Sequence, residues 1–187
     1  GVVNSAGIAA DIPALETTAA LFRKVLDVNV AGTFMVARAA ARVMRNTGGG
    51  SIVNISSMAG LHGGMGRSAC GVSQGAVIGL TQVLANDLAR HGIRVNAVAP
   101  GPVDTPITRA MPSTRAMQST RAMQSTTTRA MHSQQDRAQW MTRRHARPDE
   151  VANVIEFLLD GTRSSYITGE TVAVDGGFHA AGILAPQ

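Results

Sequence analysis

The chain has 187 residues, of which 44% are hydrophobic, 16% are charged and one is cysteine, and its formal net charge is +5. This length and composition predict a single domain with one sizeable core, and one cysteine excludes an internal disulfide. We identify neither an apolar run of about 20 residues nor a charged and apolar leader, so we expect a cytoplasmic protein without a membrane partner.

The positive charge belongs to one segment. Residues 108–147 hold eight arginines against one acid, Asp136, so the rest of the chain is slightly acidic. Clustered arginines attract phosphate, but sequence-tolerant nucleic-acid binding also needs aromatic side chains for base stacking, and the segment has only Trp140. We therefore interpret the segment as an arginine-rich loop and disfavour nucleic acid as a partner.

The first half of the chain alternates short apolar runs with helical patterns. Residues 1–4 predict a strand that ends at a turn. Thr17 or Thr18 is a suitable cap for a helix that runs through Val28. A second helix is expected over residues 29–45, because four apolar residues recur at a spacing of three to four: Phe34, Ala37, Ala41 and Met44.

The second half continues the same alternation. A strand is expected over 51–55 and a long helix over 68–90, followed by Gly92 as a stop signal. Further along, the patterns predict a strand, a helix and a last strand, over residues 94–99, 149–159 and 171–174. Strands that alternate with helices predict a parallel α/β sheet.

A tandem repeat interrupts this pattern. Residues 108–133 contain the unit Thr-Arg-Ala-Met-x-Ser four times with a six-residue period, broken once by an extra pair of threonines. Six residues advance an α-helix by about 600°, so the methionines rotate around the axis and build no core face. Stacked repeats need about 20 residues or more per unit. We therefore predict that residues 108–147 are a loop inserted within a single domain spanning residues 1–187.

Several separated motifs occur in one order along the chain. They are Asn4-Ser-Ala-Gly7, Asn29, Ser56-Ser57, the helix at 68–90, Asn96-Ala-Val-Ala-Pro-Gly-Pro-Val-Asp-Thr105 and Val174-Asp-Gly-Gly177. Together they resemble the short-chain dehydrogenase/reductase family. The resemblance implies a partial Rossmann-like parallel sheet with flanking helices, the C-terminal part of a doubly wound fold. It also implies an alcohol or carbonyl oxidoreductase that uses NAD or NADP.

The resemblance also assigns roles to individual residues. Ser57 corresponds to the serine that polarises the substrate carbonyl, and Asn29 to the asparagine that steadies the active site. Both residues also have a purely structural interpretation, Ser57 at a strand end and Asn29 as a helix cap. Cofactor contacts are implied at two turns, by Asn4, Ala6, Gly7, Pro100, Gly101, Val103 and Thr105.

Two departures from the family pattern affect the chemistry. The family places a Tyr-x-x-x-Lys pair on the long helix, and here those positions are Cys70 and Gln74. The tyrosine would donate a proton to the developing alkoxide, and the lysine would lower its pKa and bind the nicotinamide ribose. A thiol is shorter by most of a phenol ring, and Gln74 has no charge. We therefore predict that the chain is catalytically inactive.

The cofactor half of the family fold has no counterpart in the sequence. A Gly-x-x-x-Gly-x-Gly turn that would meet the pyrophosphate follows none of the predicted strands. Residues 60–66 are rich in glycine, but they lie between Ser57 and the long helix. The expectation is an N-terminally truncated family member with at most weak cofactor binding.

Other candidate sites are weaker. Cys70 with His62 would be a thiol nucleophile, but a reactive thiol needs a cationic neighbour or a helix N-terminus, and pairing across a glycine loop is unsupported. The remaining histidines show no metal-ligand spacing, so no metal site is expected: His91, His132, His145 and His179.

Two functions besides oxidoreductase activity stay open. The chain could be a non-catalytic interaction module that forms a homo-oligomer, or binds an intact relative, through the helices at 29–45 and 68–90. Alternatively, the absent cofactor turn, the replaced catalytic pair and the repeat are what a degenerate gene remnant without function would accumulate.

Overall fold

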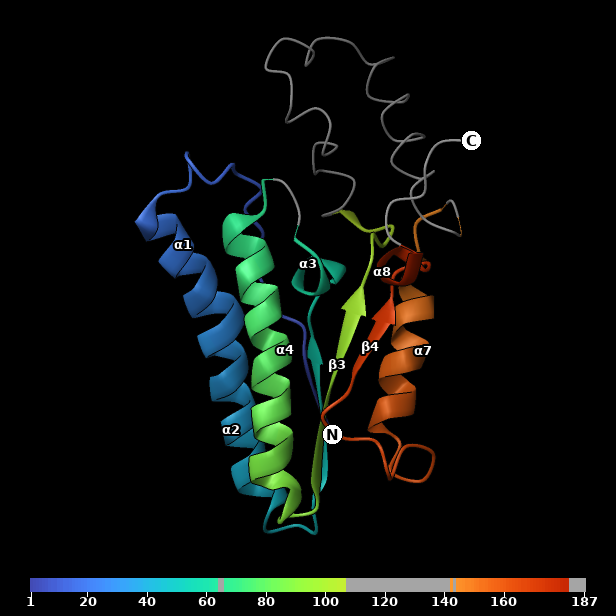
Figure 1. Cartoon of the computed structure of the whole chain (residues 1–187). Coiled ribbons are helices and arrows are strands. Elements are labelled where there is room, and N and C mark those ends of the chain that lie inside the picture. Colours follow the sequence, from blue (N-terminus) through green and yellow to red (C-terminus); the bar gives the residue numbers. More distant parts are fainter. Residues whose placement is uncertain (64–65, 107–141, 143, 182–187) are drawn as a thin grey trace.

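The computed structural model describes residues 1–63, 66–106, 142 and 144–181 (Figure 1). The described part contains one parallel sheet in the order β1-β2-β3-β4, made of Val2–Asn4, Gly50–Ile55, Ile93–Pro100 and Thr171–Val174. This confirms the partial Rossmann-like sheet, with each predicted strand within one residue of its expected ends. The predicted loop at 108–147 lies outside the described residues except for 142 and 144–147.

Helices cover both faces of the sheet. On one face lie α1 (Ala19–Leu26), α2 (Gly32–Met44) and α4 (Ser68–Ala89), and on the other lies α7 (Pro148–Leu159) (Figure 1). Central strands buried on both faces explain the nearly continuous apolar runs in the sequence. Two short helices that sequence analysis missed, α3 (Met58–Leu61) and α8 (Phe178–Ala181), lie beyond the C-terminal ends of the strands.

The two helices predicted on either side of Asn29 are one continuous helical path. A π-helical turn, Asp27–Ala31, joins α1 to α2, so the predicted boundary at Asn29 is wrong. Asn29 does not cap a helix but lies buried inside this turn. At the start of the path Thr18 is the cap, because its hydroxyl accepts a hydrogen bond from the backbone N–H of Leu21 at 3.2 Å.

The core consists of two apolar clusters, one on each face of the sheet. The first contains Ala37, Ala41, Met44, Ile52, Leu84, Ala85, Ile93 and Val95. The second contains Val53, Val98, Val151 and Leu158. Three of the four residues expected on the core side of α2 are buried there. Phe34 is 38% exposed, and the Arg38 guanidinium lies 5.5 Å from the centroid of its ring.

The helix α4 has 22 residues and a mean hydropathy of 1.2 over its most apolar window, enough by length and composition to cross a membrane. It therefore corrects the expectation that the chain has no such run. In the described fold α4 packs against β3, α1 and α3, which is the environment of a helix in a folded core.

A chain of buried amides and hydroxyls connects three elements. Asn4 Nδ2 donates to Asn54 Oδ1 at 2.8 Å, and Asn54 Nδ2 donates to Thr81 Oγ1 at 2.9 Å. All three side chains are buried, so Asn4 and Asn54 depend on this chain for hydrogen-bond partners, while the Thr81 hydroxyl also donates to the Val77 carbonyl at 2.8 Å. This chain sets the position of β1 relative to β2 and α4.

We expect Asn54→Ala to lower the free energy of unfolding by about 2–4 kcal/mol, because it removes the acceptor of the buried Asn4 amide and the donor to Thr81 Oγ1, and opens a cavity. Chemical denaturation measures the change. The matched control is Asn46→Ala, which removes one exposed hydrogen bond to the Arg42 carbonyl and should change stability by about 0.5 kcal/mol or less. Equal effects of the two substitutions would contradict the structural role of the chain.

Candidate functional site

The serine pair at the end of β2 connects this strand to two helices. Ser56 Oγ donates to the Gln74 carbonyl at 2.9 Å, which holds β2 against α4. Ser57 is the N-cap of α3, and its Oγ accepts a hydrogen bond from the Ala59 N–H at 3.2 Å. The Ser57 hydroxyl proton stays available for a carbonyl oxygen. Its place beyond the carboxyl end of a parallel strand is where open α/β sheets bind ligands.

Cys70 lies in the first turn of α4 and is half-buried. Desolvation and then the Asp11 carboxylate raise the pKa of its thiol, while Arg67 and a hydrogen bond from the Ala10 backbone oppose the rise. The thiol is therefore protonated at neutral pH. A reactive cysteine needs the opposite environment, so the geometry gives no support to Cys70 as a nucleophile.

Gln74 lies one turn further along α4. Its Oε1 is buried and has no hydrogen-bond partner among the residues that the structure describes. The backbone at Gln74 approaches α3 so closely that a Cβ on Gly60 would lie 2.6 Å from the Gln74 carbonyl carbon. Glycine is required at position 60 for this contact, which brings Ser57 and Gln74 to the same part of the fold.

Asn29 joins the loop after β1 to α4. Its Oδ1 accepts the Ile8 N–H at 2.8 Å, and its Nδ2 donates to the Ile8 carbonyl at 3.0 Å and to Ser73 Oγ at 3.0 Å. All three of these hydrogen bonds connect parts of the fold to one another. The side chain of Asn29 therefore acts as a positioning group for α4, while a catalytic role of the residue stays a prediction.

The cofactor contacts expected in the loop after β1 lie at the C-terminal edge of the sheet. Asn4 is buried and uses one N–H of its side-chain amide to bind Asn54. Ala6 and Gly7 follow in the loop, and a Cβ on Gly7 would meet Asn29 Oδ1 at 3.2 Å.

The contacts expected after β3 lie at the same edge. Pro100 ends β3, and Gly101 donates its N–H to the Val174 carbonyl at 3.0 Å. Val103 forms an isolated parallel bridge with Ala146, and Thr105 follows two residues later. The residues implied for cofactor binding therefore lie at the same C-terminal edge of the sheet, and binding itself stays a prediction.

These residues fit a dinucleotide in part. The buried, unpartnered Gln74 Oε1 is an acceptor suited to a ribose hydroxyl. The residues that the structure describes contain no glycine-rich turn between a strand and a helix that would bind a pyrophosphate. The described residues therefore suit only the nicotinamide end of a dinucleotide cofactor.

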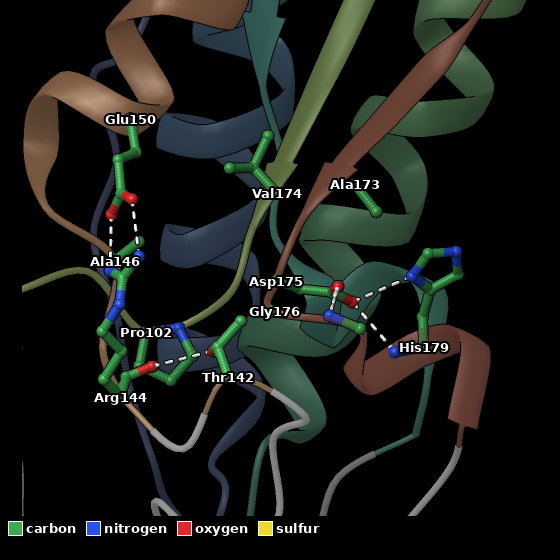
Figure 2. Close-up of a pocket in the computed structure, with 11 residues that line it drawn as sticks. Pro102, Thr142, Arg144, Ala146, Glu150, Ala173, Val174, Asp175, Gly176 and His179 are labelled. Carbon is green, nitrogen blue, oxygen red and sulfur yellow. Dashed lines mark hydrogen bonds and ion pairs between the residues drawn. The ribbon is translucent and has the colours of Figure 1, made fainter.

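Sequence analysis missed a cavity of about 330 Å³ beside β4 (Figure 2). Its wall includes the buried Asp175 carboxylate, which accepts hydrogen bonds from the Gly177 N–H, the His179 N–H and the His179 ring. On the opposite side Arg144 binds Glu150 through two hydrogen bonds of 2.7 Å. Hydrogen bonds from Arg144 and from the Arg147 N–H lower the pKa of Glu150 to about 2. The four-residue spacing of Asp175 and His179 in the sequence could have indicated that these two side chains interact.

Comparison with known proteins gives consistent matches along the chain. A family profile described as enoyl-(acyl carrier protein) reductase matches residues 1–179. The (3R)-3-hydroxyacyl-CoA dehydrogenase of Rattus norvegicus is 39% identical over 177 residues, and the 3-oxoacyl-[acyl-carrier-protein] reductase of Thermotoga maritima is 36% identical over 180 residues. These alignments cover 94% of this chain but 61% and 64% of the two relatives.

Solved structures agree with this result. Levodione reductase superposes with a TM-score of 0.85 at 30% identity, covering 96% of this chain and 66% of that protein. A protein described as belonging to the short-chain dehydrogenase/reductase family has a TM-score of 0.78 at 35% identity, with coverages of 96% and 67%. ElxO, solved with NADP bound, has a TM-score of 0.79 at 30% identity, with the same coverages.

The environment of Cys70 predicts low thiol reactivity. We expect iodoacetamide to alkylate it at neutral pH at least about tenfold more slowly than a free thiol, because the thiolate fraction is small. Asp11→Asn should accelerate the reaction, since it removes a negative charge that raises the thiol pKa. Alkylation at the rate of glutathione would contradict this prediction.

The same raised pKa makes stability depend on pH. The unfolded chain loses the thiol proton at about pH 8.5 and the folded chain at a higher pH. The unfolding free energy should therefore fall as pH rises above the unfolded value and level off above the folded one. Cys70→Ser should remove this component of the pH profile.

Proposed function

The chain belongs to the short-chain dehydrogenase/reductase family, and on that basis we propose that it is an oxidoreductase scaffold that has lost the family's proton-transfer chemistry. The observation that carries the proposal is the occupation of the tyrosine and lysine positions by Cys70 and Gln74. The carbonyl-polarising half of the site persists in Ser57, while the proton-donating half does not.

Three physical arguments support the loss of turnover. The Cys70 side chain is shorter than that of tyrosine and is half-buried. Its raised pKa also makes it a weaker acid than an ordinary cysteine thiol. Gln74 is neutral and therefore supplies no positive charge to stabilise an oxyanion. Properly positioned general acid catalysis contributes about 10²- to 10⁴-fold to a rate, so losing it suppresses reduction even where a substrate binds.

Cofactor binding is the second part of the proposal. When bound, NAD(P)H supplies the hydride that reduces a carbonyl. In this chain Gln74 would hold a ribose hydroxyl through its unpartnered Oε1, and Ser57 would orient the substrate oxygen. A neutral amide replaces a charged ammonium, and charge-assisted hydrogen bonds are the stronger ones. We therefore infer that cofactor binding by this chain is weak.

We expect the chain to show no NADH- or NADPH-dependent reduction of 3-oxoacyl thioesters or diketones, the substrates suggested by the relatives' names. Absorbance at the reduced-nicotinamide band measures the rate. The matched variant Cys70→Tyr with Gln74→Lys should also stay at background, because the sequence still lacks the pyrophosphate turn. Wild-type turnover of about 1 s⁻¹ or more would overturn the proposal. Turnover in the double variant alone would confine the defect to the two replaced residues.

A specific surface favours a second function, self-association. Five large apolar side chains of α2 and α4 are 50–64% exposed: Met35, Val36, Val43, Val72 and Val83. The two helices lie next to each other on the side away from the sheet (Figure 1). We name these five residues the α2–α4 patch. Large apolar side chains exposed on two neighbouring helices are a feature of interaction sites.

We infer that the partner at the α2–α4 patch is a second copy of the chain. Two-fold dimers bury the same surface on both subunits, so that surface must complement itself. The patch satisfies this condition because α2 presents the exposed cations Arg38 and Arg42, while α4 presents the exposed Asp87. In a two-fold arrangement, α2 of one copy can place its arginines against α4 of the other.

We expect the chain to dimerise, and Val36→Glu combined with Val83→Glu to weaken the dimer at least about tenfold, because each change buries an unpaired charge. Sedimentation velocity over a range of concentrations measures the association. The control is Leu15→Glu, a change at a fully exposed apolar residue outside the patch, which should leave the dimer intact. A monomeric wild type, or a dimer insensitive to the double change, would contradict the inferred interface.

If neither turnover nor association is found, a remnant without function is the remaining interpretation.

A further inference from the structure

Two histidines far apart in sequence lie side by side in the fold. His62 follows α3, His179 lies in α8, and their ring centroids are 6.5 Å apart with the planes tilted by 45°. Phe178 packs edge-on against His62 at 5.8 Å, which holds α8 against α3. The proximity of the two imidazoles therefore results from tertiary packing and not from a local motif.

His179 is held in one ring orientation by a buried carboxylate. Its Nδ1 lies 3.0 Å from Asp175 Oδ2, and the Asp175 side chain is 2% exposed (Figure 2). The N–H groups of Gly177 and His179 bind the same carboxylate, so its position is fixed by the backbone. A carboxylate that accepts the Nδ1 proton leaves Nε2 with its lone pair free, the arrangement in which histidine binds metals.

His62 supplies a second available imidazole. Within the described part of the chain its ring nitrogens have no hydrogen-bond partner, although its ring contacts Phe178 and His179. The nearby cation Arg67 lines a cavity with His62, but Asp11 lies 3.8 Å from the Arg67 Nε and offsets its charge. The negative charge of Asp175 favours a cation between the two rings.

We propose that His62 and His179 together bind one divalent transition-metal ion, with Zn²⁺ as the ion to test, and that Asp175 positions His179. Two imidazoles that share a zinc ion at about 2.0 Å from each nitrogen have ring centres about 5–6 Å apart. The observed 6.5 Å requires an approach of about 1 Å, which the exposed His62 side chain can make by rotation while His179 stays bound to Asp175. Imidazole nitrogen suits zinc, copper and nickel.

The composition of the proposed site limits its affinity for the metal ion. No cluster of three or more His, Cys, Asp or Glu side chains suited to a metal occurs in the described ranges. The proposed site has two protein ligands, so water molecules complete the coordination. It includes neither Cys70 nor Gln74 and does not depend on the proposed loss of turnover.

Isothermal titration of the full chain with Zn²⁺ tests the proposal at a pH about one unit above the ordinary histidine pKa of about 6.5. We expect one ion per chain, with binding lost in His62→Ala and in His179→Ala. The control His91→Ala removes a half-buried histidine that accepts a hydrogen bond from Arg90, and this variant should bind zinc as the wild type does. A zinc-dependent rise in melting temperature, seen in the wild type and in His91→Ala alone, would support the same conclusion.

A second variant separates positioning from ligation. Asp175→Asn keeps both imidazoles but replaces the carboxylate, and the loss of such an outer partner weakens metal binding by about 10- to 100-fold. Circular dichroism of each variant establishes that it is folded before titration. The proposal is overturned if the wild type binds no zinc, or if the two single histidine variants bind it as tightly as the wild type does.

Discussion

The carboxamide of Asn29 is the contact on which the rest of the site depends. It binds both backbone groups of Ile8 and the hydroxyl of Ser73, so the loop after β1, the helical path α1–α2 and the helix α4 meet at one buried amide. Ser73 in turn donates to the carbonyl of Cys70 at 2.8 Å. The π-helical turn at Asp27–Ala31 accommodates this side chain within the helical path, a common use of π-turns at functional sites.

In this chain the residues that stabilise the fold differ from those at the positions of the family's catalytic pair. The side chains that align the strands and helices are satisfied, including Asn54 between Asn4 and Thr81, and Asn96, which binds the Ile167 carbonyl and the Glu170 N–H. The replaced residues Cys70 and Gln74 lie on the same rigid helix without disturbing it. Because fold stability comes from packing and hydrogen bonds that do not include the reacting groups, the catalytic pair can be lost while the fold is retained.

Sequence periodicity was sufficient for the sheet and for most of the helices, because strands buried on both faces leave continuous apolar runs. It failed where a tertiary contact overrides the local pattern. Asn29 has the composition of a cap, yet its partners are remote in sequence, so the continuous helix through it was not predictable. Phe34 fits the apolar repeat but is 38% exposed, and the meeting of His62 with His179 depends on how two four-residue helices pack beyond the strand ends.

The bridge between Val103 and Ala146 has a consequence for how this gene can vary. Backbone hydrogen bonds from Asp104 to Ala146 and from Ala146 to Pro102, of 2.9 and 3.0 Å, bring the two ends of the repeat-containing segment together at the sheet edge. The entropic cost of closing a loop rises only with the logarithm of its length, so one more six-residue unit adds on the order of 0.1 kcal/mol. A change in the number of repeat units should therefore have little effect on the free energy of unfolding.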